Sequence, residues 1–282
     1  METATTLDQI RARLKDWRAA GERIGLVPTM GALHPGHMSL VDGCRAAAGK
    51  VVVSLFINPR QFGPNEDLDA YPRDVESDAA QLDAAGVDLL YAPTLDQVYP
   101  EGFATTISPK GPAEGLEDDH RPGFFDGVAT VVTKLFLQTG ADVATFGEKD
   151  YQQLIVVKRF VRDLDVPIEI VAMPTIREED GLACSSRNAY LDTAQRRIAP
   201  RLWQTLSTAA QTIRTTDTPD AIVADAKRDL EACFDEVEYV AWRDGETLMP
   251  NPANDRPSRL LAAVRLGTTR LIDNVAVAPG KV

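Results

Sequence analysis

Lys50-Val-Val-Val-Ser-Leu-Phe-Ile57 is the stretch that decides the fold, because it is the most strand-like segment of the chain. It is short, rich in β-branched residues and almost continuously apolar. That pattern is typical of a central parallel strand buried on both faces. A polar loop rich in Pro, Gly, Asn and Asp follows over residues 58–72. The segment therefore predicts the middle of a parallel sheet, with a loop at its carboxyl end.

Similar apolar runs alternate with helical patterns on both sides of this strand. The expected strands are 24–29, 86–93, 142–146 and 168–173, and the expected helices are 36–48, 73–85, 127–139 and 151–164. Such alternation predicts an α/β fold, a Rossmann-like doubly wound parallel sheet with helices on both faces. Ligands bind beyond the carboxyl ends of the strands in sheets of this kind.

The pattern changes in the C-terminal third. Helices are expected over 193–215 and 219–234, followed by a strand at 237–243 and a hairpin of 260–266 and 270–277. The hairpin strands are joined by Gly-Thr-Thr, so they are expected to be antiparallel. We therefore expect two domains: residues 1–185 form the Rossmann-like domain, and residues 186–282 form a smaller α+β domain that acts as a lid over the site.

Composition narrows the function classes. The 282 residues are 44% hydrophobic and 26% charged, which excludes wholesale disorder. The 30 Lys and Arg against 42 Asp and Glu leave a net charge of −12, which argues against a nucleic-acid partner but leaves small anionic ligands open. No transmembrane or signal pattern is present, so we expect a cytoplasmic protein with no membrane partner. The three cysteines are far apart, and neither a disulfide framework nor a metal site is expected from them.

Residues 28–37, Pro-Thr-Met-Gly-Ala-Leu-His-Pro-Gly-His, follow the first expected strand. His34 and His37 are three residues apart near a helix start, so they should face the same side. Gly36 would let a ligand approach the backbone, and a helix N-terminus suits a polyphosphate. The alternatives are histidines that merely cap the helix, or a metal pair, for which no third ligand lies at suitable spacing nearby.

Neutral amides follow the central strand. Asn58 and Gln61 can both donate and accept hydrogen bonds, which suits a hydroxylated substrate. The alternative is an Asn-Pro turn whose polar side chains are solvated.

A third motif, Phe-Gly-Glu-Lys-Asp-Tyr-Gln-Gln, covers residues 146–153. Lys149 can meet a phosphate, Asp150 can orient a ribose or a Mg²⁺-bound water, and Gln153 lies one helical turn beyond. The stretch lacks the spacing of a P-loop, and a solvated turn is the alternative.

Residues 180–188, Asp-Gly-Leu-Ala-Cys-Ser-Ser-Arg-Asn, lie at the expected domain boundary. Two hydroxyls followed by a guanidinium can cradle phosphate oxygens, and a loop on a hinge could close over a triphosphate. An interdomain linker with a helix-capping Ser is the alternative. Arg121 could stabilise an anion or form a surface ion pair, and the acidic runs 117–119 and 178–180 are expected to be solvated.

Five motifs of this chain, in their order along the sequence, closely resemble those of pantoate–β-alanine ligases (pantothenate synthetases), members of the nucleotidylyltransferase superfamily. The motifs are PTMGALHPGH, INPRQF, RPGFFDGV, FGEKDYQQL and GLACSSRN. The resemblance covers about residues 24–192. It implies ATP-dependent condensation of (R)-pantoate with β-alanine through a pantoyl adenylate, with release of AMP and pyrophosphate. It also implies Mg²⁺ held largely by triphosphate oxygens, and a homodimer.

The resemblance also implies residue roles. His37 corresponds to the proposed proton donor of the family, although His34 and His37 can both act as donors to phosphate oxygens. Gln61 and Gln153 would clamp pantoate, with Gln61 also near β-alanine. The residues implied for ATP are Met30, Gly31, Ala32, Leu33, His34, Pro35, Gly36, His37, Gly147, Glu148, Lys149, Asp150, Ile176, Cys184, Ser185, Ser186 and Arg187. Those implied for catalysis are His34, His37, Lys149, Ser185, Ser186 and Arg187, and those for the other substrates are Asn58, Gln61, Arg121 and Gln153.

Two residues depart from the common pattern. Phe124 stands where many relatives carry a His, and Cys184 replaces the commoner Leu or Met. Two other functions stay open at this stage. A plain nucleotidylyltransferase would not need the two glutamines and the large C-terminal domain, and a non-catalytic nucleotide sensor would not need the His, Lys and Ser-Arg set.

Overall fold

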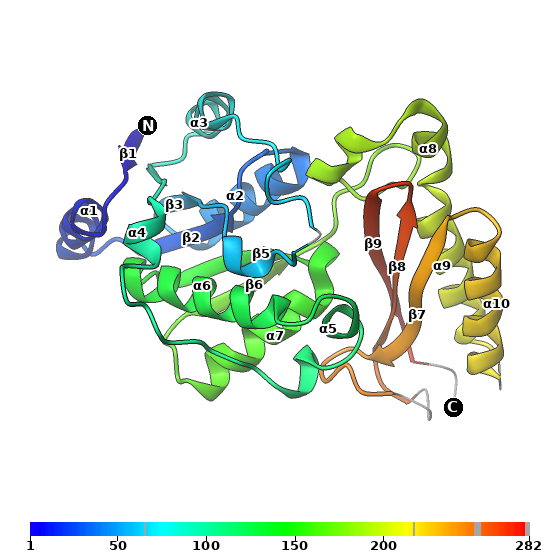
Figure 1. Ribbon diagram of the computed structural model, residues 1–282. Coiled ribbons are helices and arrows are strands. Elements are labelled where there is room, and N and C mark those ends of the chain that lie inside the picture. Colours follow the sequence, from blue (N-terminus) through cyan, green and yellow to red (C-terminus); the bar gives the residue numbers. More distant parts are fainter. Residues whose placement is uncertain (65, 217, 251–254, 280–282) are drawn as a thin grey trace.

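The computed structural model describes residues 1–64, 66–216, 218–250 and 255–279. It has a six-stranded parallel sheet and a three-stranded antiparallel sheet (Figure 1). The strand order of the large sheet is β1-β4-β3-β2-β5-β6. The predicted fold class is confirmed, because the parallel sheet is flanked by helices and a smaller domain follows it.

The central strand is where the sequence places it. β3 (Lys50–Leu55) lies between β2 (Ile24–Thr29) and β4 (Leu89–Tyr91), and residues 51–55 are buried. The sheet continues through β5 (Val143–Gly147) and β6 (Glu169–Met173).

Helices cover both faces of this sheet. α2 (Pro35–Ala47) and α3 (Val75–Ala84) pack on one face, with Val51, Val53 and Leu55 of β3. α1 (Leu7–Ala19), α6 (Phe124–Thr139) and α7 (Tyr151–Asp163) pack on the other face, with Val52. Alternate residues of one strand thus enter two cores, as expected for a strand buried on both faces.

The smaller domain is a helix-covered antiparallel sheet. β7 (Glu236–Asp244), β8 (Ser258–Leu266) and β9 (Thr269–Val277) are paired antiparallel, which confirms the predicted hairpin. α9 (Arg201–Ile213) and α10 (Pro219–Glu231) cover one face, and the other face is turned toward the parallel-sheet domain (Figure 1). The division at residues 185 and 186 stays a prediction, although Leu182 already packs into the second core.

Two features differ from expectation. The single helix expected over 193–215 is wrong, because Pro200 separates α8 (Thr193–Ile198) from α9. Proline lacks the N–H that a continuous helix would need. At the N-terminus, β1 (Glu2–Ala4) and α1 form where no element was predicted.

The short helices are α4 (Leu95–Val98), α5 (Glu117–His120) and the 3₁₀ turns η1 (Pro59–Gln61), η2 (Gly111–Ala113), η3 (Glu148–Asp150) and η4 (Ser186–Tyr190). In the described part of the chain, no helix combines the length and apolarity that crossing a membrane requires.

Candidate active site

A cavity of about 730 Å³ lies at the carboxyl ends of the parallel strands, between the two domains. It brings together every motif that the sequence singled out. The predicted residues that line it are Met30, His34, Gly36, His37, Gln61, Arg121, Gly147, Lys149, Asp150, Gln153, Ile176, Cys184, Ser185, Ser186 and Arg187. The predicted residues outside its lining are Gly31, Ala32, Leu33, Pro35, Asn58 and Glu148.

A buried carboxylate shapes the loop between β2 and α2. Asp78 of α3 accepts hydrogen bonds from the backbone N–H groups of Ala32 (2.9 Å) and Leu33 (2.8 Å). Gly31 and Ala32 both have positive φ there, 88° and 50°. Gly31, Ala32 and Leu33 therefore shape the loop from outside the cavity lining. Sequence reasoning missed Asp78, because it lies far from the loop in the chain.

The two histidines lie side by side at the start of α2. Their ring centroids are 4.0 Å apart. Nδ1 of His34 accepts from the Gly36 N–H at 3.1 Å, so His34 caps the helix and its own N–H is at Nε2. A Cβ on Gly36 would lie 2.8 Å from the His34 ring, so a larger residue at this position would displace that ring. His34 thus both caps α2 and lines the cavity, where the sequence treated these as alternatives.

Both imidazoles are neutral at neutral pH. Burial, helped by the charge of Lys149, lowers the pKa of His34 to about 4. Burial, with His34 and Lys149 adding to it, lowers the pKa of His37 to about 3. Nδ1 of His37 is buried with no hydrogen-bond partner among the described residues. Each neutral ring can therefore donate one N–H hydrogen bond to an anion, and neither ring adds positive charge.

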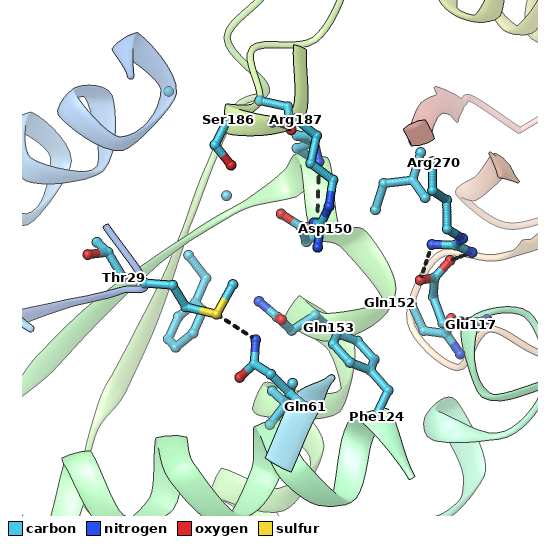
Figure 2. Close-up of a pocket in the computed structure, with 18 of the residues that line it drawn as sticks. Thr29, Gln61, Glu117, Phe124, Asp150, Gln152, Gln153, Ser186, Arg187 and Arg270 are labelled. Atoms are coloured by element: carbon cyan, nitrogen blue, oxygen red, sulfur yellow. Dashed lines mark hydrogen bonds and ion pairs between the residues drawn. The ribbon is translucent and has the colours of Figure 1, made fainter. Parts of the chain in front are cut away.

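A buried amide supports the glutamine at the other end of the cavity. Asn58 is 1% exposed, donates to Gln61 Oε1 (3.0 Å) and to the Gly127 carbonyl (3.1 Å), and accepts from the Tyr99 hydroxyl (2.8 Å). Asn58 therefore lies behind the residues that line the cavity and orients Gln61. Figure 2 shows Gln61 and Gln153 directed into the cavity from η1 and α7.

The turn after β5 is held from the smaller domain. The Asn274 side chain donates to the carbonyls of Glu148 (2.8 Å) and Lys149 (3.0 Å). The Glu148 carboxylate pairs with Arg259 at 2.9 Å and so turns away from the cavity. Lys149 and Asp150 remain in the lining, 3.6 Å apart at their charged atoms. Strand β9 thus fixes the segment that presents Lys149.

The hydroxyl and guanidinium groups of residues 185–187 face the same space. Ser185 Oγ caps η4 by accepting from the Arg187 N–H at 3.3 Å, so the capping Ser of the sequence analysis is also a lining residue. The Arg187 guanidinium forms a two-point contact with Asp67 at 3.1 and 2.8 Å. Ser186 Oγ lies 3.4 Å from the Tyr71 hydroxyl.

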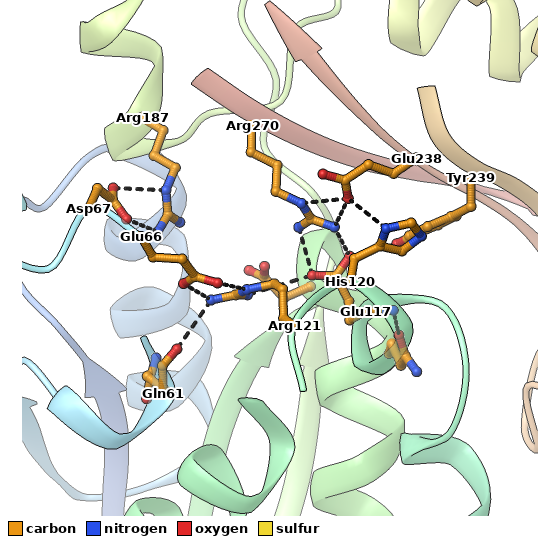
Figure 3. A network of polar contacts seen from close by, with 12 residues as sticks. Gln61, Glu66, Asp67, Glu117, His120, Arg121, Arg187, Glu238, Tyr239 and Arg270 are labelled. Carbon is orange, nitrogen blue, oxygen red and sulfur yellow. Dashed lines mark hydrogen bonds and ion pairs between the residues drawn. The ribbon is translucent and has the colours of Figure 1, made fainter. Parts of the chain in front are cut away.

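A network of buried charges joins the two domains beside the cavity (Figure 3). The Arg270 guanidinium contacts Glu117 at 2.7 and 2.8 Å and Glu238 at 2.7 Å, and the Tyr239 hydroxyl donates to Glu117 at 2.7 Å. Burial alone would raise the pKa of Glu117, but Arg270 holds that pKa below its ordinary value.

One sequence expectation is wrong in this region. Glu117 is 4% exposed and is not part of a solvated acidic face. For Arg121 the sequence left an anion site and a surface ion pair open. Its side chain is 13% exposed, lines the cavity and pairs with Glu66 at 2.7 Å, and a role toward an anion stays a prediction. Arg270, Glu117 and Glu238 were missed because nothing local in the sequence shows that they meet.

Comparisons with known proteins agree on one family. The family described as "Pantoate-beta-alanine ligase" matches residues 2–276. A pantothenate synthetase of Rhizorhabdus wittichii is 54% identical over 280 residues, 99% of each chain. The crystal structure of a pantothenate synthetase from Thermus thermophilus is similar with a TM-score of 0.88 and 46% identity, covering 99% of this chain and 100% of the other. A pantoate–β-alanine ligase from Francisella tularensis, "Complexed with Beta-gamma ATP and Beta-alanine", has a TM-score of 0.82 at 33% identity and covers 98% and 97% of the two chains.

Proposed function

This chain belongs to the pantoate–β-alanine ligase family and is an ATP-dependent ligase. We propose that pantoate and β-alanine are joined in its cavity through a pantoyl adenylate. The observation that carries the proposal is the convergence of the histidine pair, Lys149 and residues 185–187 on one cavity, which Gln61 and Gln153 also line. The first group suits a triphosphate, and the glutamines suit a hydroxy acid.

In the first step, a carboxylate oxygen of pantoate attacks the α-phosphorus of ATP. The bond from that phosphorus to the bridging oxygen breaks, and pyrophosphate leaves. Neutral His34 and His37 donate hydrogen bonds to phosphate oxygens, and Lys149 and Arg187 offset the charge that moves onto pyrophosphate. The protein contributes position and charge, with no covalent intermediate of its own.

In the second step, the neutral amine of β-alanine attacks the acyl carbon and releases one proton to water as the amide bond forms. The carbon–oxygen bond to AMP breaks, so AMP leaves with an oxygen atom that came from pantoate. Gln61 and Gln153 hold pantoate across both steps, with Asn58 fixing the Gln61 amide. Ile176 provides an apolar contact for adenine.

Mg²⁺ fits this donor set as an ion carried by ATP. Asp150 lines the cavity with its side chain about half exposed, and one carboxylate plus phosphate oxygens is a usual magnesium environment. Among the described residues no group of three His, Cys, Asp or Glu is placed to hold a metal. When bound, Mg²⁺ would offset phosphate charge. The homodimer and the cytoplasmic location stay predictions, which sedimentation and fractionation would test.

The test is pyrophosphate release against a panel of small hydroxy acids, each with and without β-alanine. We expect pyrophosphate only with pantoate, and pantothenate only when β-alanine is added. Release driven by a phosphorylated alcohol instead would indicate a plain nucleotidylyltransferase. Calorimetric ATP binding with no turnover of any acid would indicate a sensor.

A further inference from the structure

β-Alanine brings a second carboxylate into the cavity, and the roles proposed so far leave that carboxylate without a binding partner. That group takes no part in the proposed reaction, on which this inference rests, yet it must enter a partly enclosed space. A buried carboxylate is costly unless a cation or several donors pair with it. Among the described residues, the Lys and Arg side chains that line the cavity are Arg121, Lys149, Arg187, Arg265 and Arg270.

Four of these cations are assigned to the triphosphate or to buried carboxylates, whereas Arg121 pairs with Glu66 and, through Nη1 at 3.6 Å, with Glu117. Lys149 and Arg187 lie in the two segments that suit the triphosphate. Arg270 is enclosed by Glu117 and Glu238, whose side chains are 6% and 2% exposed. Arg265 also pairs with Glu238, at 2.9 Å, and is 39% exposed.

Arg121 has the geometry of a carboxylate site. Its Nε and Nη2 atoms each lie 2.7 Å from one oxygen of Glu66, which is the two-point contact that a guanidinium makes with a carboxylate. The guanidinium lies over the Phe124 ring, 3.7 Å from its centroid, and Nη2 also donates to the Gln61 carbonyl at 3.2 Å (Figure 3). Arg121 is thus adjacent to the residue expected near β-alanine.

We propose that Arg121 binds the carboxylate of β-alanine through its Nε–Nη2 edge, and that Glu66 occupies the place of this carboxylate when the substrate is absent. Glu66 lines the same cavity and is 23% exposed, so it can leave the guanidinium for water. The Phe124 ring packs against the guanidinium and supports its plane. Glu66 and β-alanine therefore compete for one cation.

The experiment compares β-alanine with propylamine, in which a methyl group replaces the carboxylate, as acceptors in the second step. For Arg121→Gln we expect kcat/KM for β-alanine to fall by roughly 10- to 100-fold, while kcat/KM for propylamine changes by less than about 3-fold. The matched control is Arg60→Gln, which removes a guanidinium from η1 outside the cavity lining and should leave the discrimination intact.

Glu66→Gln supplies the second arm. It removes the competitor, so the KM for β-alanine should fall by about 3-fold or more in the wild-type background. In the Arg121→Gln background it should have no such effect. A structural role of Arg121 would not produce this dependence.

Two results would overturn the proposal. One is unchanged discrimination between β-alanine and propylamine in Arg121→Gln, whether kcat/KM for both amines falls equally or does not fall. The other is a raised KM for ATP with the KM for β-alanine unaltered. The last would place the triphosphate at Arg121. Failure of the proposed function is separate, because the wild-type protein would then release no pyrophosphate with pantoate.

Discussion

Replacing Gly127 by alanine should weaken pantoate binding, although Gly127 itself is not part of the cavity lining. Gly127 lies in α6, where a Cβ would be 2.2 Å from the Arg60 carbonyl oxygen and 2.8 Å from the Gln61 backbone nitrogen. Ordinary Cβ contacts begin at 3.4 Å, so η1 must move away by more than 1 Å, the difference between 3.4 and 2.2 Å. Backbone atoms cannot swing aside as a flexible side chain can.

The displaced turn carries Gln61, and Asn58 would be pulled from its bond to the Gly127 carbonyl. We expect kcat/KM for pantoate to fall by about 100-fold, since a misplacement of 1 Å can cost that much. Overpacking should also lower the free energy of unfolding by about 1–3 kcal/mol. The assay is pyrophosphate release with pantoate titrated at saturating ATP, and urea unfolding reports the stability.

The control is Gly63→Ala, two residues after Gln61. A Cβ there meets the Glu66 side chain at 3.6 Å, which is ordinary contact, so kcat/KM for pantoate should stay within about 3-fold of wild type. If folded Gly127→Ala behaves like this control, then the close packing of α6 on η1 does not position Gln61 and the reasoning is refuted.

Three further predictions concern the charges of the site. His37→Ala or Lys149→Ala should each slow adenylate formation by about 100-fold or more, measured as pantoate-dependent ATP–pyrophosphate exchange, and unchanged exchange would remove them from the mechanism. As the pH falls from 6.5 to 5, the unfolded chain protonates its histidines while folded His34 and His37 stay neutral, so the free energy of unfolding should decrease. His37→Gln should reduce this decrease by about 1 kcal/mol between pH 6 and 5 in urea titrations. An unaltered slope would contradict the lowered pKa of His37. Glu117→Gln should lower the free energy of unfolding by about 3 kcal/mol, because Arg270 loses a charged partner. The control Asp119→Asn changes an exposed carboxylate and should cost less than about 0.5 kcal/mol. Equal costs would show that the buried network adds little stability.

Local patterns were enough for five of the six strands of the parallel sheet and for the edge at which the motifs lie, whereas the roles of the motif residues came from the family resemblance. A continuous apolar run such as β3 is typical of a strand in the middle of a parallel sheet. The motifs that follow the strands therefore lie at the carboxyl edge of that sheet. α1 was missed although Thr6 and Gln9 form a capping box and Ile10, Leu14 and Trp17 share its buried face. Apolar residues at this i, i+4 and i+7 spacing behind a capping box are a local signal of an amphipathic helix, so the sequence did contain the evidence for α1.

What the sequence could not show depends on residues that are distant in the chain. Glu117 and Arg270 are 153 positions apart, so neither a solvated nor a buried role could be read from the acidic run alone. The neutrality of His34 and His37 follows from burial, which no local spacing reveals. Asn58 carries the right chemistry, but only the fold shows that it acts from behind Gln61.

The most direct test of the account follows an oxygen atom. Pantoate labelled with ¹⁸O in its carboxylate is converted with ATP and β-alanine, and the AMP, pyrophosphate and pantothenate are separated and weighed by mass spectrometry. Attack of that carboxylate on the α-phosphorus predicts one ¹⁸O atom in each AMP and none in pyrophosphate. Unlabelled AMP, or label in pyrophosphate, would contradict the claim that the cavity holds the carboxylate of pantoate beside the α-phosphorus.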